Sequence, residues 1–353
     1  TPRVNDGSLL FLQHMISKMK PVEQGGSRIA IVFNASPLFA GGAGSGESEI
    51  RRWILENDWL EAIVALPDQL FYNTGIATYF WILSNRKATA LRDKVILLDG
   101  RDYWAKMPKS LGDKRKYITD EQIEELTRIY KDALKIAEDP NHEHNAKVKV
   151  LPRHAFGYQR ITVERPLRQR FEVTAETVEA VARAKAVEKY EHHDALLTAL
   201  ESLVSTACHA KLEFVAKLDA ALREHGLSKL PAPVEKAIWA EVAVSDPAGE
   251  LQSDPKGRAL PDPNLREHEN VPLSSIEFTS AELKTEVEEY MKQEVLPYVP
   301  DAWVDHSKTK IGFEIPFARH FYSYTPPRQL EEIDAEIKTL ESEIQKLIGE
   351  VTK

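Results

Sequence analysis

The chain has 353 residues, enough for two or three domains, and its 42% hydrophobic and 29% charged residues are typical of a globular protein. Its net charge of −9 excludes a protein that binds nucleic acid with its whole surface, so any DNA contact needs local basic patches or a partner. The single cysteine, Cys208, excludes a disulfide framework and suits the cytoplasm, and no apolar run has the length of a membrane span or forms a signal peptide.

Residues 1–140 are predicted to form an α/β domain. Ser8–Lys20 has the apolar spacing of a helix, with Ser8 as its N-cap, and a second helix is expected to begin near Ser48. Short apolar runs predict four strands: Arg28–Phe33, Leu60–Leu66, Ala77–Leu83 and Lys94–Asp99. The first two strands are expected to be parallel because a helix-sized crossover joins them. The third follows the short connection Pro67–Ile76, which suits an antiparallel hairpin at the sheet edge.

A further amphipathic helix is predicted over Ile118–Glu138, with Thr119 as its N-cap and Asp139-Pro140-Asn141 as its end. The α/β domain is expected to end in this region.

Three phrases in this domain carry a family resemblance: Asn34–Phe39 (NASPLF), Glu49–Asp58 (EIRRWILEND) and Leu66–Ile76 (LPDQLFYNTGI). Together they resemble the M (modification) subunit of type I restriction–modification systems, an HsdM-like DNA adenine-N6 methyltransferase. Three later phrases extend the resemblance: Gln159–Arg168, Glu269–Leu273 and Gly312–Phe317.

The resemblance implies the later part of a Rossmann-like methyltransferase sheet, followed by a mainly α-helical region. The intact subunit is expected to methylate adenine N6 in DNA with S-adenosylmethionine as methyl donor. The resemblance also implies an S (specificity) subunit that chooses the site and an R (restriction) subunit that cuts unmethylated DNA.

Two motifs of such methyltransferases are missing from the sequence: the glycine-rich cofactor loop after a first strand, and the Asn-Pro-Pro-Phe box that grips the adenine amino group. The chain is therefore interpreted as the C-terminal portion of an M subunit, inactive alone and without catalytic residues of its own. The alternative is a non-catalytic helical interaction module with a degenerate α/β domain.

The glycine-rich loop Gly41–Gly46 has two interpretations. It could cradle a phosphate at a helix N-terminus, or it could simply be a flexible connection. Glu47 and Glu49 would repel an anion there, and no P-loop lysine follows, so the connection is favoured.

Phe71, Tyr72 and Asn73 lie in the connection after the second strand. An enzyme that modifies a base must flip it out of the duplex and stack it on an aromatic face, so these residues are candidates for stacking or positioning the target base. The family resemblance places Phe71 first in this role. The alternative is that Phe71 covers the sheet edge and Gly75 provides a positive φ.

Residues 141–244 are predicted to be a basic connector followed by a helical region. The basic residues are candidates for contacts with the DNA backbone: Arg153, Arg160, Arg165, Arg168 and Arg170. The alternative is that these arginines pair with the abundant acids of the chain. His142 and His144 have no third ligand within reach, so no metal site is predicted.

Residues 245–270 carry four prolines and few large apolar residues, which indicates a linker or surface arm. Residues 271–353 form the last region and end in a predicted coiled-coil helix over 328–353. Its apolar residues alternate at spacings of three and four: Leu330, Ile333, Ile337, Leu340, Ile344 and Leu347, with Val351 continuing the pattern.

Glutamates at the flanking g positions, such as Glu336 and Glu343, would repel each other in a parallel homodimer. A different partner helix is therefore predicted, and the resemblance implies that it belongs to the S subunit. The alternative is packing within the same chain.

Overall fold

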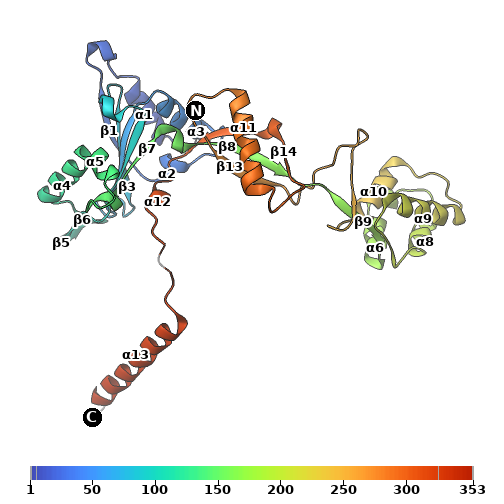
Figure 1. Cartoon of the computed structure of the whole chain (residues 1–353). Helices are drawn as coiled ribbons and strands as arrows, with labels where there is room; N and C mark the ends of the chain where they lie inside the picture. Colours follow the sequence, from blue (N-terminus) through green and yellow to red (C-terminus); the bar gives the residue numbers. More distant parts are fainter. Residues whose placement is uncertain (1, 5, 325, 352–353) are drawn as a thin grey trace. The chain divides into compact units, whose positions relative to one another are not determined.

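The computed structural model describes residues 2–4, 6–324 and 326–351 (Figure 1). The chain divides into two compact units, and the division falls within helix α3 (Gly46–Glu56). The first unit consists of Gly41–Trp53 and His154–Phe313. The second consists of Pro2–Ala40, Ile54–Arg153 and Glu314–Lys353.

The second unit is built on a five-stranded mixed sheet with the strand order β1-β3-β2-β4-β7. The strands are β1 (Arg28–Phe33), β2 (Leu60–Leu66), β3 (Thr78–Ser84), β4 (Lys94–Asp99) and β7 (Val148–Pro152). Only the β2–β4 pair is parallel among these neighbours, and the other pairs are antiparallel. The structure therefore has the mixed α/β class that the sequence predicts.

The place of β3 differs from the sequence prediction. Both β1 and β2 pair with β3 in antiparallel fashion, so β1 and β2 do run in the same direction, as expected. However, β3 lies between them and is not an edge strand. The β3 backbone has a partner on each side, because Ile82 lies opposite both Ala30 of β1 and Ala62 of β2.

The sheet also extends past the predicted domain end at residue 140. Strand β7 pairs with β4 from Lys94↔Pro152 to Leu98↔Val148. Val95–Leu98 are almost completely buried, and their backbone groups need a partner on the side away from β2. A segment assigned to the connector supplies that partner.

Two helices cover one face of this sheet: α4 (Asp120–Lys131) and α5 (Ala133–Glu138) (Figure 1). Thr119 caps α4 as predicted, in a capping box in which Gln122 N–H donates to the Thr119 hydroxyl. The predicted single helix is broken at Asp132. Ile129, Ala133 and Ile136 pack against Ala62 and Ile96 of the sheet, which forms the core of this face.

Helix α1 (Ser8–Ile16) is shorter than predicted. Its N-terminal hydrogen bond comes from Asp6, whose carboxylate accepts from the Ser8 amide at 3.1 Å, so Ser8 is not the cap. The remaining elements of this unit are β5 (Ala105–Leu111), β6 (Lys114–Tyr117), α2 (Ser36–Phe39), α12 (Phe317–His320) and α13 (Leu330–Val351).

The first unit contains two small sheets. One centres on β8 (Gly157–Glu164) and includes β13 (Glu267–Pro272), β14 (Trp303–Val304) and β15 (Lys310–Phe313). Helix α11 (Ser280–Tyr290) and the π-helical turn Met291–Val295 cover one of its faces, where Val287 and Met291 pack on Ile161 and Val163.

The other sheet centres on β9 (Arg168–Val173), with β10 (Thr206–Cys208), β11 (Ala243–Ser245) and β12 (Glu250–Leu251). Five helices share its core: α6 (Ala175–Ala182), α7 (Lys185–Glu188), α8 (His193–Glu201), α9 (Lys211–Glu224) and α10 (Ala232–Val242). Phe171 and Phe214 stack at its centre. The region predicted to be helical within residues 141–244 therefore contains these helices, together with the short strands β10 and β11.

Residues 245–270 are not a free linker. Leu167 N–H donates to Leu260 O at 2.8 Å, and Gln252 N–H donates to Leu167 O at 2.9 Å. Asp262 is buried. The prolines and glycines of this segment form turns between short pieces that pair with the chain around β9. Its composition therefore predicts turns, but it does not predict a flexible segment.

Helix α13 spans Leu330–Val351, the residues in which the sequence predicts a heptad. Ile337, Leu340, Ile344 and Leu347 are each about half exposed, between 48% and 60%. The side chain of Val351 lies outside the described residues. No helix in the described ranges combines the length and apolarity needed to cross a lipid bilayer.

Candidate nucleic-acid interface

The connection after β2 presents two aromatic side chains to solvent. Phe71 is 36% exposed and Tyr72 is 63% exposed, and the neighbouring Asn73 is exposed as well. A short antiparallel bridge between Phe71 and Thr74 makes the turn tight. About a third of the Phe71 side chain is therefore open to water and available to a ligand. The positive φ in this connection belongs to Gln69 (φ 58°) and not to Gly75.

The hairpin β5–β6 holds this connection in place. Asp113 N–H donates to Tyr72 O at 3.0 Å, while the amides of Arg115 and Lys116 donate to Gln69 O at 3.0 and 3.2 Å. Gly112 is required at the turn because its φ is +62° and a Cβ there would lie 2.4 Å from Tyr72 O. The aromatic side chains therefore stand on a braced turn.

Two of the five candidate arginines are occupied within the protein. Arg153 donates to the carbonyl groups of Leu55 and Glu56 at 3.1 and 2.6 Å, and its Nε lies 2.7 Å from Asp93. Arg170 pairs with Glu172 and lies 3.1 Å from Asp246. Pairing with nearby acids, the alternative interpretation, describes both residues.

Arg165 and Arg168 share one weak partner. Their Nε atoms lie 3.9 and 4.0 Å from the carboxylate of Asp301, and both side chains are about 40% exposed. One carboxylate at this distance leaves part of their charge available to a ligand.

Arg160 is different, because it is exposed and forms no ion pair within the described ranges. Lys310 of β15 lies directly opposite it, and Thr162, His268 and Lys308 line the same hollow of about 470 Å³. Like charges facing each other across two strands destabilise a sheet. An anion bound between them would remove that cost.

The acid nearest this hollow is already neutralised. Glu164 is buried, and both Arg266 Nε and Lys308 Nζ lie 2.9 Å from its Oε1. Burial alone would raise the pKa of Glu164, but the hydrogen bonds from Arg266 and Lys308 outweigh it and lower the pKa. Lys308 also lies 2.9 Å from the carboxylate of Asp305, so two acids balance Arg266 and Lys308, and the surplus positive charge of this hollow is that of Arg160 and Lys310.

The N-terminal part of the chain is similar to known proteins. Residues 1–155 match the N-6 DNA Methylase family. Over part of its length the chain is similar to the methylase subunits of type I restriction enzymes. It is 30% identical over 105 residues to the type I restriction enzyme MjaVIII methylase subunit of Methanocaldococcus jannaschii, a match that covers 30% of this chain and 17% of the relative.

The type I restriction enzyme EcoKI methylase subunit of Escherichia coli is 31% identical over 134 residues, which covers 38% of this chain and 23% of that subunit. The crystal structure of a type I restriction–modification methyltransferase subunit from Streptococcus thermophilus aligns with a TM-score of 0.34 at 25% identity, covering 43% of this chain and 28% of that one. The matched part of the chain thus covers less than a quarter of the length of each of these two curated relatives.

The glycine-rich loop Gly41–Gly46 is held against β15. Gly44 N–H donates to Ile311 O at 3.0 Å, so this amide is engaged in holding the loop against β15. A Cβ on Gly41 would lie 2.3 Å from the Ser45 hydroxyl, which explains the glycine by packing. At Gly41 and Gly44 the loop is thus held by packing and by a hydrogen bond to β15.

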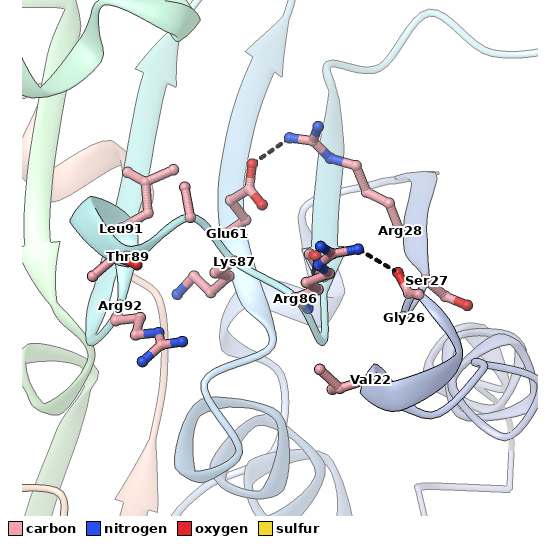
Figure 2. Close-up of a pocket in the computed structure, with 13 residues that line it drawn as sticks. Val22, Gly26, Ser27, Arg28, Glu61, Arg86, Lys87, Thr89, Leu91 and Arg92 are labelled. Atoms are coloured by element: carbon pink, nitrogen blue, oxygen red, sulfur yellow. Dashed lines mark hydrogen bonds and ion pairs between the residues drawn. The ribbon is translucent and has the colours of Figure 1, made fainter.

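A polar hollow of about 690 Å³ lies in the second unit, where β1 and β2 begin and β3 ends. Figure 2 shows residues that line it. Arg28 pairs with Glu61, and Arg86 donates to Gly25 O at 3.3 Å. The ammonium group of Lys87 lies 2.6 Å from Asp58 and is buried, which lowers its pKa. Most of the charged side chains in this hollow therefore have partners within the protein and connect the ends of neighbouring strands.

No group of three histidine, cysteine or carboxylate side chains in the described part of the chain is arranged to hold a metal ion. His144 lies 3.4 Å from Glu143 and 3.7 Å from Glu125, and its ring centroid is 5.6 Å from that of His142.

Sequence reasoning missed a different group, the lysines of the β5–β6 hairpin, although their density in residues 106–116 is visible in the sequence.

Proposed function

We propose that the intact protein is the M subunit of a cytoplasmic type I restriction–modification enzyme, which transfers a methyl group from S-adenosylmethionine to adenine N6 in DNA. An S subunit chooses the site, and an R subunit cuts DNA that lacks the methyl group. The match of residues 1–155 to the N-6 DNA Methylase family is the observation that carries this proposal.

In this proposal, Phe71 and Tyr72 receive the target adenine after it leaves the duplex, and Asn73 helps to position it. Two exposed aromatic rings on a braced turn at the carboxyl end of β2 support that role. Their exposure in the absence of DNA means that a base would meet them without prior rearrangement, which reduces the cost of binding.

The chain alone is proposed to be inactive. The Gly44 amide of the glycine-rich loop is bonded to Ile311 O, so we assign donor binding to other residues of the intact subunit. The five-stranded sheet would then be the later part of a Rossmann-like methyltransferase sheet. Its antiparallel β3 between two parallel strands is compatible with that role.

Arg160 is proposed as the main contact with the DNA backbone among the five arginines, together with Lys310. Both are exposed cations without an acidic partner among the described residues. Arg165 and Arg168 would add weaker contacts, whereas Arg153 and Arg170 hold the fold together.

Helix α13 is proposed to form a coiled coil with a helix of the S subunit. Its stripe of half-exposed apolar residues supports this role, because an isolated helix with such a stripe gains little stability by itself. The acids at its g positions select a partner helix with basic flanks.

The test uses the intact subunit together with its S subunit and a labelled methyl donor. Transfer of label to adenine in duplex DNA is expected, and the chain described here should transfer none. If the intact pair binds the donor and still leaves adenine unmodified, the proposal is wrong, and the non-catalytic interaction module becomes the better interpretation.

A further inference from the structure

The hairpin β5–β6 concentrates positive charge in a chain that is acidic as a whole. Between residues 105 and 117 the sequence contains five cations and one acid, Asp113, against a net charge of −9 for the whole chain. The cations are Lys106, Lys109, Lys114, Arg115 and Lys116. Such a local reversal of sign marks a surface that attracts an anionic partner.

Two of the five cations have partners inside the protein. Lys116 Nζ lies 2.5 Å from Asp68 and 4.1 Å from the centre of the Trp104 ring. Lys114 Nζ lies 5.3 Å from the centre of the Tyr72 ring. These contacts fix the hairpin to the aromatic turn and orient the Tyr72 ring.

The other three cations face solvent. Lys106, Lys109 and Arg115 are exposed, and no acid in the described ranges pairs with them. A cation that neutralises no acid of its own protein carries its full charge to a ligand, which for a polyanion releases bound counterions.

Apolar and aromatic surface lies among these charges. Trp104 is 39% exposed, Leu111 is 47% exposed and Tyr117 is 41% exposed. The amide of Asp113 donates to Tyr72 O, so the same hairpin also touches the turn proposed to hold the target base. Cations for phosphates and rings for sugars and bases occur together in proteins that bind nucleic acid.

We infer that the β5–β6 hairpin binds the phosphates of duplex DNA next to the target adenine, through Lys106, Lys109 and Arg115. This inference rests on the proposed function and deepens it. The hairpin holds the backbone beside the extruded nucleotide, while the hydrogen bonds at Gln69 and Tyr72 fix the distance between that backbone contact and the aromatic turn.

A different explanation of the lysines is that they protect the edge of a two-stranded sheet against pairing with other chains. Replacing them would then lower solubility without changing DNA affinity. The two explanations therefore differ in a measurable quantity, the dependence of DNA affinity on salt.

The experiment compares the full chain with the triple variant Lys106→Gln, Lys109→Gln, Arg115→Gln. Binding to a fluorescent DNA duplex is measured by anisotropy over a series of salt concentrations. The logarithm of the affinity should fall less steeply with the logarithm of salt in the variant, by about 0.9 for each lost phosphate contact. A total change in slope of about 2 to 3 is expected.

The matched control removes the same charge elsewhere, with Lys185→Gln, Lys189→Gln and Lys236→Gln, all exposed residues of the helical region. Its slope should stay within 1 of the parent chain. If the parent binds the duplex and the two triple variants behave alike, the hairpin inference is wrong and the proposed methyltransferase function is untouched. If no version binds duplex at low salt, the inference is also wrong, whereas the proposed function fails only in the methylation assay.

Discussion

The guanidinium group of Arg51 donates from Nε to the carbonyl oxygen of Phe313 at 2.6 Å, across 262 positions of sequence. Arg51 is 1% exposed, and the Ser48 hydroxyl accepts a hydrogen bond from the Phe313 amide at 2.9 Å. One turn of α3 thus satisfies both backbone groups of a residue at the end of β15. The phrases around Glu49–Asp58 and Gly312–Phe317, which both resemble the M subunit, meet at this point.

Replacing Arg51 with lysine should loosen this junction. Lysine keeps the charge but lacks the planar group that reaches Phe313 O and Gly41 O together, so about 2–3 kcal/mol of local stability should be lost. Hydrogen–deuterium exchange in peptides containing Phe313 should become about 30- to 150-fold faster. Arg183→Lys, at an exposed helical pair, is the control, and equal acceleration in both variants would contradict the role of Arg51.

The aromatic turn should act in base extrusion. Phe71→Ala and Tyr72→Ala in the intact subunit should each slow single-turnover methyl transfer by about 5- to 150-fold, because stacking on one ring contributes about 1–3 kcal/mol per base. Tyr72→Phe keeps the ring and should retain most of the rate. A base analogue whose fluorescence rises on unstacking, placed at the target adenine, should respond less in the alanine variants; an unchanged response would rule out a stacking role.

The heptad stripe of α13 should be needed for assembly and not for folding. Leu340→Asp with Leu347→Asp should abolish co-elution with the S subunit, since both side chains are at least half exposed in the chain alone. The melting temperature of the chain should not change. Ala335→Asp with Ser342→Asp adds the same charge on the opposite face of the helix and should leave assembly intact; loss of assembly in this control would point to charge and not to the stripe.

The Arg160–Lys310 pair should lower the stability of the folded protein and strengthen its binding to DNA. Arg160→Gln or Lys310→Gln relieves a like-charge contact and should raise the free energy of unfolding by about 0.2–1 kcal/mol in the absence of DNA. The same variants should bind duplex DNA more weakly, with a salt dependence shallower by about 0.9. Denaturation and anisotropy measure the two effects, and a loss of stability in both variants would mean that the residues have a structural role instead.

The ion pairs of Glu164 should make the stability of the small sheet depend on pH. The folded-state pKa of Glu164 lies below its value in an unfolded chain, so its contribution is present above about pH 4.5 and is lost as the pH falls through the folded-state pKa. Glu164→Gln should cost about 1–3 kcal/mol near pH 7, because its hydrogen bonds to Arg266 and Lys308 are charge-assisted. The difference from the parent chain, measured by denaturation, should shrink below pH 4.5; a difference that is constant down to pH 2 would contradict the ion-pair origin.

Local features of the fold follow from the sequence. Apolar runs identify β1, β2, β3 and β4 within one residue of their bounds, and the Thr119 cap of α4 is correct. Each of these depends on side chains within a few positions of one another. The heptad of α13 and the exposed aromatic residues of the 71–73 turn are likewise visible in neighbouring residues.

The choice of partners was decided by the tertiary structure. Whether β3 lies at an edge or between two strands depends on its pairing with both β1 and β2. Whether residues 245–270 are loose depends on their backbone hydrogen bonds to Leu167 beside β9. The partners of the arginines also depend on the tertiary structure, since Arg153 forms an ion pair with Asp93 while Arg160 lies opposite Lys310. Local sequence determines which segments form helices and strands, because short-range sterics and periodicity govern them. Pairing between distant segments is set by burial and hydrogen bonding, which depend on residues far apart in the chain.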